Sequence, residues 1–278
     1  MSASTVAQPY APHHAARPAP LRVGPLQAVR HGLALAGRGV ARLRTSPAML
    51  ADVILTPVVF LLMFVYLFGG AIGGGDPDAY LQTVVPGIMV MTVFQASIGI
   101  GVSLNADAGT GVFDRFRSMP IARSAPLIGA VLADLVRYVV ALAVLLGLAF
   151  AMGYRVQTTF AALPVAIAVL LVFGLSFSWI SVYLGMLVKS PGAVQGMMTI
   201  LILPLTFASN VFVPSQTMPG WLQAWSGVNP VSLMAETLRG LMNGGAVAGP
   251  LLGSLAWMAA AVAIFFPLAM RAYRRNAA

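Results

Sequence analysis

Two charged residues interrupt a long apolar run near the middle of this sequence. Asp134 and Arg137 are three residues apart within residues 127–147, so a helix would place both on one face. A charge at the centre of a membrane costs roughly 2.5–3.5 kcal/mol on insertion scales, so such charges generally pair or face a cavity. We interpret the two as an internal ion pair near the cytoplasmic boundary of a membrane span. The alternative is that Asp134 is a proton-relay or substrate-binding carboxylate.

Residues 111–123 combine aromatic and charged side chains between two apolar runs. The sequence predicts a short helix here, which ends at Pro120. Such a helix can insert aromatic side chains into a groove of a partner protein while its arginines fix the orientation. The alternative is that the rings only rest on the membrane surface. The candidate contact residues are Phe113, Asp114, Arg115, Phe116, Arg117 and Met119.

No catalytic constellation is visible in the sequence. Its one lysine, Lys189, does not follow a glycine-rich phosphate loop, and no His-Glu pair, nucleophile elbow or acidic metal cluster occurs. Cysteine is absent, which excludes thiolate metal sites. We therefore predict that the chain is not an enzyme and holds no metal or cofactor. Energy for uphill transport would have to come from a partner or from an ion gradient.

The composition predicts an all-α polytopic membrane protein. The chain of 278 residues is 59% hydrophobic and 8% charged, whereas a soluble domain is about 25% charged. Apolar runs of about 20 residues recur, the length that crosses a hydrocarbon core of about 30 Å. We place six spans at about 50–68, 81–104, 127–147, 163–188, 193–212 and 250–270.

The N-terminal region divides into two parts. Residues 1–25 are rich in Ala and Pro and lack the apolar core of a signal peptide, so we expect a disordered tail. Residues 26–44 repeat apolar positions at intervals of three and four, with arginines on the opposite side. This pattern predicts a basic amphipathic helix along the membrane surface. Packing on a soluble partner is the alternative.

The distribution of basic residues predicts that both termini are cytoplasmic. With that orientation, thirteen lysines and arginines fall on inner segments and only Arg155 and Arg239 on outer ones. Cytoplasmic loops carry such an excess of basic residues. The net charge of +9 therefore reflects membrane topology, and we expect no nucleic-acid partner.

Residues 213–248 precede the last predicted span and have mixed polarity. Prolines and a Gly-Gly pair divide them into two helix-length pieces. Non-spanning backbone at membrane depth must be buried in protein or face a cavity, so we predict two re-entrant half-helices at the outer leaflet, with a possible gating role. An amphipathic outer loop without gating is the alternative. The candidate residues are Trp221, Asn229, Pro230, Glu236, Arg239 and Gly240.

Two of these motifs resemble a known family. Residues 113–120, Phe-Asp-Arg-Phe-Arg-Ser-Met-Pro, followed by Ala122-Arg123, resemble the cytoplasmic motif of ABC-2 type transporter permeases, in particular the daunorubicin/doxorubicin-resistance group. Residues 229–231, Asn-Pro-Val, and 236–241, Glu-Thr-Leu-Arg-Gly-Leu, are similar to the motif of that family before the last span. The resemblance covers about residues 26–275.

The resemblance implies a function and partners. ABC-2 permeases pair as two six-span subunits with two separate ATP-binding subunits, and residues 111–123 would be the coupling helix that contacts the ATPase. The expected function is the permease subunit of an ATP-driven exporter of amphiphilic drugs, antibiotics or lipid-like compounds in the cell membrane. The partner would bind ATP and Mg, and the permease would form a homodimer. A proton-coupled secondary transporter using Asp134 is the alternative.

Overall fold

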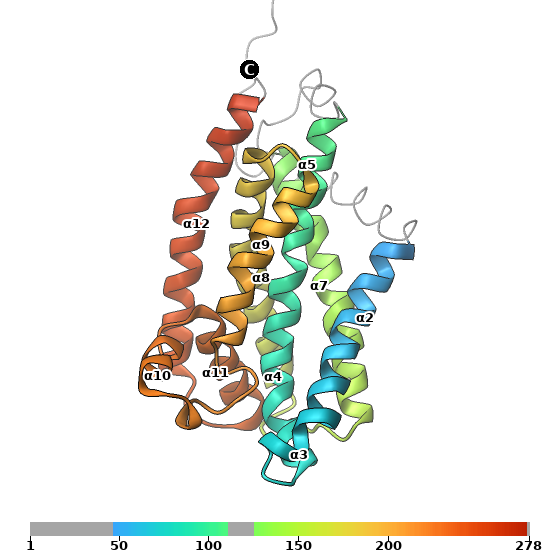
Figure 1. Cartoon of the computed structure of the whole chain (residues 1–278). Coiled ribbons are helices and arrows are strands. Elements are labelled where there is room, and N and C mark those ends of the chain that lie inside the picture. Colours follow the sequence, from blue (N-terminus) through green and yellow to red (C-terminus); the bar gives the residue numbers. More distant parts are fainter. Residues whose placement is uncertain (1–46, 111–124, 277–278) are drawn as a thin grey trace, which may run out of the picture.

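The computed structural model describes residues 47–110 and 125–276, and every regular element within them is a helix (Figure 1). The predicted tail 1–25, the predicted amphipathic helix 26–44 and the predicted docking stretch 111–123 lie outside the described residues. The elements are α2 Pro47–Met63, the π-helical turn η1 Phe64–Phe68, α3 Gly69–Ile72, α4 Pro77–Ala96, α5 Ile98–Gly109, α7 Ala125–Ala151, α8 Ala162–Leu187, α9 Pro191–Phe207, the short 3-10 turn η2 Ser215–Thr217, α10 Gly220–Ser226, α11 Pro230–Asn243 and α12 Ala248–Asn276.

Within the described residues, five helical stretches are long and apolar enough to cross a membrane, and a further apolar helix, α9, is shorter. This confirms the predicted all-helical, polytopic class. The α4–α5 stretch is continuous apart from a break at Ser97. The five stretches are Ile54–Ile72, Pro77–Gly109, Leu127–Ala151, Ala162–Leu187 and Ala248–Arg275.

Helix caps explain where the observed boundaries differ from the predicted ones. Helix α4 begins before the predicted residue 81 because the Asp76 carboxylate accepts hydrogen bonds from two backbone N–H groups of its first turn, with Pro77 at the first helical position. Helix α9 ends at Phe207, before the predicted residue 212. There the Asn229 side chain donates to the carbonyls of Leu205 and Ala208, so a distant residue satisfies the end of the helix.

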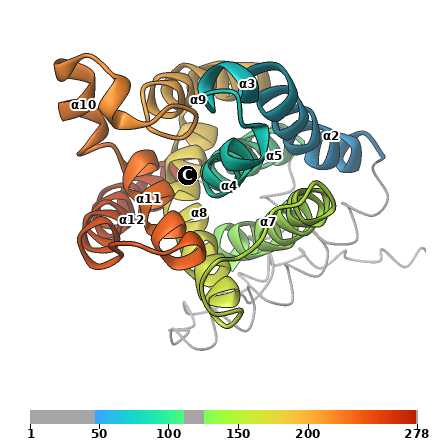
Figure 2. The same cartoon turned by 90° about the horizontal axis from the view of Figure 1, so that it is seen from below.

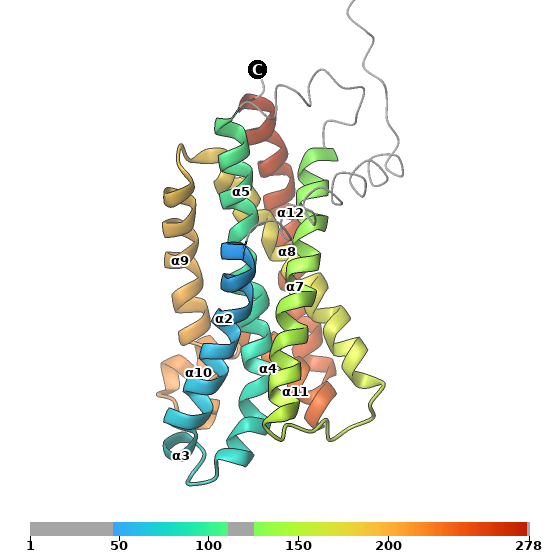
Figure 3. The same ribbon diagram turned by 90° about the vertical axis from the view of Figure 1, so that its right-hand side faces the viewer.

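The long helices run side by side along one axis, which gives the molecule two distinct ends (Figures 1 and 3). One end holds the C-terminal ends of α5, α8 and α12 and the start of α7. We call it the Lys189 end, after the turn between α8 and α9. The opposite end holds α3, α10 and α11, and we call it the Trp221 end (Figure 2). Exposed basic residues gather at the Lys189 end: Lys189, Arg271, Arg274 and Arg275.

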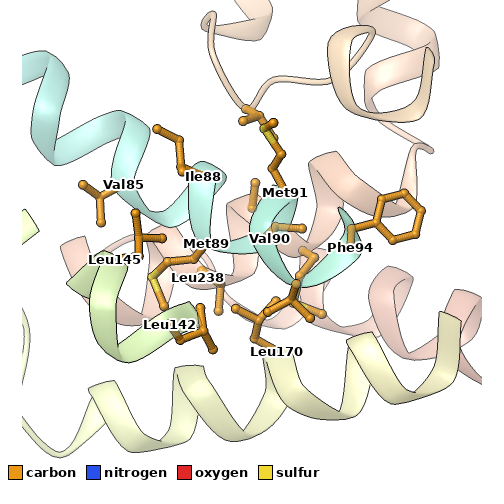
Figure 4. Close-up of a cluster of buried hydrophobic side chains, with 14 of the residues drawn as sticks. Val85, Ile88, Met89, Val90, Met91, Phe94, Leu142, Leu145, Leu170 and Leu238 are labelled. Carbon is orange, nitrogen blue, oxygen red and sulfur yellow. The ribbon is translucent and has the colours of Figure 1, made fainter. Parts of the chain in front are cut away.

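Helix α4 forms the centre of the packed core. Its residues Val85, Ile88 and Met89 are fully buried, and they lie in one cluster with Leu142 of α7 and Leu238 of α11 (Figure 4). The span that contains α4 has 72% of its most apolar window buried, against 17% for α12. The short helix α11 is therefore part of the interior, while α12 lies at the periphery.

The outward faces of α2, α9 and α12 are apolar. Such faces are suited to contact with lipid tails, or with another membrane helix, because neither contact requires a polar side chain. Helix α9 buries only one narrow face, at Val194, Met198, Ile202 and Thr206. Its exposed apolar residues are Met197, Ile200, Leu201, Leu203 and Phe207.

Candidate functional site

The structure brings Asp134 and Arg137 together inside the bundle. The Arg137 Nη1 atom donates to Asp134 Oδ1 at 3.0 Å, and the Asp134 side chain is almost completely buried. The Tyr138 hydroxyl donates to the other carboxylate oxygen at 3.4 Å. Both oxygens of Asp134 therefore have donors, an arrangement that suits a structural pair.

A hydrogen-bonded chain extends from this pair to the neighbouring helix. Because the single Tyr138 hydroxyl proton points to Asp134, Ser178 is the donor of the 2.7 Å hydrogen bond between the two hydroxyls. The Gly174 carbonyl, 2.8 Å from Ser178 Oγ and one turn earlier on α8, is the alternative acceptor of the Ser178 proton. A side chain at Gly174 would contact the Tyr138 ring. The network therefore fixes α7 against α8 at the level of the charges. The spacing of Asp134 and Arg137 gave no signal for these α8 partners.

Gly99 provides the space that the Arg137 side chain occupies. A β-carbon at Gly99 would collide with the Arg137 guanidinium. Gly99 follows the helix break at Ser97, whose hydroxyl donates to the Phe94 carbonyl at 2.6 Å. The guanidinium thus packs directly against backbone where α4 passes into α5. A glycine beside a break in an apolar run is a visible sequence feature, but only the fold connects it with Arg137.

Small residues allow α5 and α8 to pack closely along a seam, which we define by Gly101, Ser181 and Gly185. Ser181 Oγ donates to the Ile98 carbonyl at 3.0 Å and accepts from the Gly101 N–H at 3.1 Å. Any β-carbon at Gly101 would clash with the Ser181 backbone, and one at Gly185 would clash with Gly101. Close approach through small residues is a common way for membrane helices to associate.

Asn105 strengthens the seam near the Lys189 end. Its Nδ2 atom donates to the Gly185 carbonyl at 2.9 Å and to the Val188 carbonyl at 2.6 Å, at the C-terminal end of α8. Four residues later α5 ends at Gly109. The helix that leads into residues 111–123 is thus hydrogen-bonded to the turn that contains Lys189.

The six candidate contact residues of the predicted docking stretch lie outside the described residues. The structure does place the helix ends that flank them: Gly109 of α5 and the first residue of α7, Ala125, are both at the Lys189 end (Figure 1). The stretch therefore connects two helices on the side where exposed basic residues gather.

Three of the candidate residues before the last span, Asn229, Pro230 and Gly240, shape α11 and the chain that follows it at the Trp221 end. Asn229 caps α11 through the Val231 N–H, and Pro230 occupies the first helical position. A side chain at Gly240 would press on the Ala246 carbonyl, so glycine allows the chain after α11 to fold back over the helix. Trp221 is 73% exposed on α10 and takes no part in this packing.

Arg239 and Glu236 lie on one face of α11, but they form hydrogen bonds with different partners. Arg239 Nε donates to the Thr83 carbonyl at 3.0 Å, and its Nη2 atom donates to the carbonyls of Asn210 and Val211 at 2.7 and 3.0 Å. Burial lowers the pKa of the Arg239 guanidinium, and the charge of Glu236 opposes that shift. Glu236 accepts from Asn210 Nδ2 at 2.6 Å. Arg239 therefore joins α4, α11 and the segment after α9.

Comparison with known proteins gives a consistent result. Residues 31–243 match the family model described as ABC-2 type transporter. The daunorubicin resistance ABC transporter permease protein DrrB1 of Streptomyces coeruleorubidus is 43% identical over 239 residues, which are 86% of this chain and 84% of that protein. The probable doxorubicin resistance ABC transporter permease protein DrrC of Mycobacterium tuberculosis is 26% identical over 223 residues, 80% of each chain. The putative transport permease ycf38 of Cyanophora paradoxa is 28% identical over 207 residues, 73% of this chain and 70% of that protein.

Proposed function

The chain belongs to the ABC-2 type transporter family and is a membrane permease, and from this premise we propose that a separate ATP-binding subunit drives it by docking on residues 111–123. ATP and Mg would bind in that subunit. The proposed contacts are the aromatic side chains Phe113 and Phe116, with Met119, as anchors, and Asp114, Arg115 and Arg117 as orienting charges.

The observation that carries the docking proposal is the connection of α5 to α8. Residues 111–123 follow α5 directly, and Asn105 and Ser181 hydrogen-bond α5 to α8 along the seam. A displacement of the docked stretch would therefore move α5 and α8 together. The Asp134–Tyr138–Ser178 network would carry the same displacement to α7.

We assign the Lys189 end to the cytoplasm and the Trp221 end to the outside. The exposed basic residues at the Lys189 end support this orientation. Docking of a cytoplasmic ATPase requires the same orientation. Under this assignment α10 and α11 are the re-entrant half-helices of the outer leaflet.

The proposed transport cycle uses two copies of the permease. The exposed apolar face of α9 and that of α2 are candidates for the contact between the copies. Closure of the two ATPases would shift residues 111–123, and substrate would leave between the copies past α10 and α11. The names of the relatives favour amphiphilic drugs or antibiotics as substrates of this chain.

Co-purification with the ATP-binding subunit tests the docking proposal. We expect Phe113→Ala or Arg115→Ala to weaken the complex and lower permease-stimulated ATP hydrolysis, because each removes an anchor or an orienting charge. A matched control is Arg274→Ala, which removes an exposed charge at the same end but outside the docking stretch. Survival of the complex and of stimulated hydrolysis after a combined change across residues 113–117 contradicts the proposal.

A further inference from the structure

A cavity of about 160 Å³ opens at the Trp221 end, between α4, α11 and the segment that joins α9 to α10. Its volume is close to the roughly 150 Å³ of an enclosed apolar cavity that binds benzene, but this cavity is half open to its surroundings. Polar groups from three parts of the chain converge on it. Its walls include Thr83, Asn210, Phe212, Gln216, Glu236 and Arg239.

Asn210 lines this cavity and carries an unpaired acceptor. Its side chain is only 3% exposed, and its Oδ1 atom accepts no hydrogen bond. The amide orientation is fixed, because Nδ2 donates to Glu236 Oε1 at 2.6 Å. A buried acceptor without a donor costs about 1–3 kcal/mol. A ligand that donates a hydrogen bond to Oδ1 would remove this cost.

Glu236 adds a negative charge that forms no ion pair, although the Arg239 guanidinium lines the same cavity. Within residues 47–110 and 125–276, no basic side chain lies within the 4.0 Å of an ion pair from its carboxylate. The nearby Arg239 directs Nε and Nη2 at backbone carbonyls instead. The cavity is therefore lined by a half-buried carboxylate, and Asn210 beside it carries a buried amide oxygen that has no donor.

The apolar wall of the cavity is rigid. The Phe212 ring stacks on Phe64 with centroids 3.9 Å apart, and the Phe212 carbonyl accepts from the Tyr80 hydroxyl at 3.1 Å. The small exposed part of Phe212 is therefore held in place and does not have to rearrange when an apolar group contacts it. Metal binding is not favoured, since no group of three metal-ligating side chains occurs in the described part of the chain.

We propose that this cavity binds a primary ammonium group carried on a small apolar skeleton. The ammonium donates to Glu236 and to Asn210 Oδ1, and the skeleton packs on Phe212. The proposal rests on the proposed function only for its place on the outer side of the membrane. Two sources have this chemistry: an exported amphiphile that bears an amine, and the headgroup of phosphatidylethanolamine.

The direct test uses 4-fluorobenzylammonium as probe and the full chain in phosphatidylcholine nanodiscs, with binding followed by fluorine NMR. Glu236→Gln keeps the side-chain shape and the hydrogen bond from Asn210 but removes the charge, so we expect the Kd to rise about tenfold or more. Asp78→Asn, which removes an exposed outer charge away from the cavity, should leave the Kd unchanged. The neutral 4-fluorobenzyl alcohol should bind more weakly than the ammonium.

A second variant keeps the test decisive if the first fails to fold. Gln216 is exposed at the rim, so Gln216→Trp should fill the entrance without disturbing the buried contacts, and it should abolish binding. The proposal is wrong if this variant binds the probe like the wild type. It is also wrong if Glu236→Gln binds as tightly as the wild type or if the alcohol binds as tightly as the ammonium.

Lipid composition distinguishes the two sources of the ammonium. Competition of the probe by phosphatidylethanolamine in mixed nanodiscs identifies the lipid headgroup as a ligand, whereas unchanged probe binding assigns the cavity to an exported amine. All of these measurements omit the ATP-binding subunit. Their failure therefore leaves the docking proposal intact, and loss of ATPase docking leaves the cavity result intact.

Discussion

Replacing Asp134 by alanine leaves the Arg137 guanidinium in the bundle without its ion-pair partner. Removing one partner of a buried pair costs about 3–5 kcal/mol, because the remaining charge is uncompensated. We expect the lower end of that range here. The Arg137 side chain retains 12% exposure, and helical side chains point toward the helix N-terminus, which for α7 is the Lys189 end.

The double variant Asp134→Ala/Arg137→Leu should be far more stable than the single one. It removes both charges, and the Tyr138 hydroxyl keeps Ser178 Oγ as a partner at 2.7 Å. Replacement of a buried pair by apolar residues is often neutral. We therefore expect a loss of about 1 kcal/mol or less, so that the second substitution recovers about 2 kcal/mol relative to Asp134→Ala.

These free energies of unfolding are measured on the purified permease in mixed micelles, by adding increasing amounts of a denaturing detergent. A loss of about 3 kcal/mol lowers the ratio of folded to unfolded protein on the order of a hundredfold. ATP-driven transport by the double variant is the second readout. A double variant as unstable as Asp134→Ala refutes the structural pair, and a stable double variant without transport shows that the pair of charges acts in transport.

Three further substitutions test the close contact between α5 and α8, the space that Gly99 leaves for Arg137, and the packing of α11. Asn105→Leu removes two hydrogen bonds to α8 and should lower the free energy of unfolding by about 1–3 kcal/mol while reducing transport more than ATPase binding. Gly99→Ala should reduce the folded yield because its methyl group meets the Arg137 guanidinium, whereas Gly109→Ala, which meets no atom within 4 Å, should not. Arg239→Gln loses three hydrogen bonds to carbonyls and should destabilise by about 2–4 kcal/mol, with the unfolding midpoint as readout.

The long apolar helices could be predicted from the sequence because a membrane imposes both length and composition on them. The ends of these helices could not. Helix α9 ends at Phe207 because Asn229, more than twenty residues later, caps its carbonyls. No pattern within α9 indicates that contact. The predicted span to residue 212 followed hydrophobicity alone.

Spacing on one helix predicted the ion pair of Asp134 and Arg137, but the same spacing elsewhere gave no ion pair. Asp134 and Arg137 are a turn apart, and the structure places them 3.0 Å from each other. The same spacing relates Glu236 and Arg239, yet each of these bonds to other partners. Tertiary packing supplied backbone carbonyls for Arg239 and the Asn210 amide for Glu236, which local spacing cannot reveal.

Reconstituted transport tests the central claim of an ATP-driven permease most directly. The chain and its ATP-binding subunit are placed in proteoliposomes, and movement of a fluorescent amphiphilic drug is followed with and without ATP and with an uncoupler. We predict transport that requires ATP and that is unchanged when the uncoupler dissipates the proton gradient. Transport that proceeds without ATP, or that collapses with the uncoupler while ATP is held constant, contradicts the claim and favours a proton-coupled carrier.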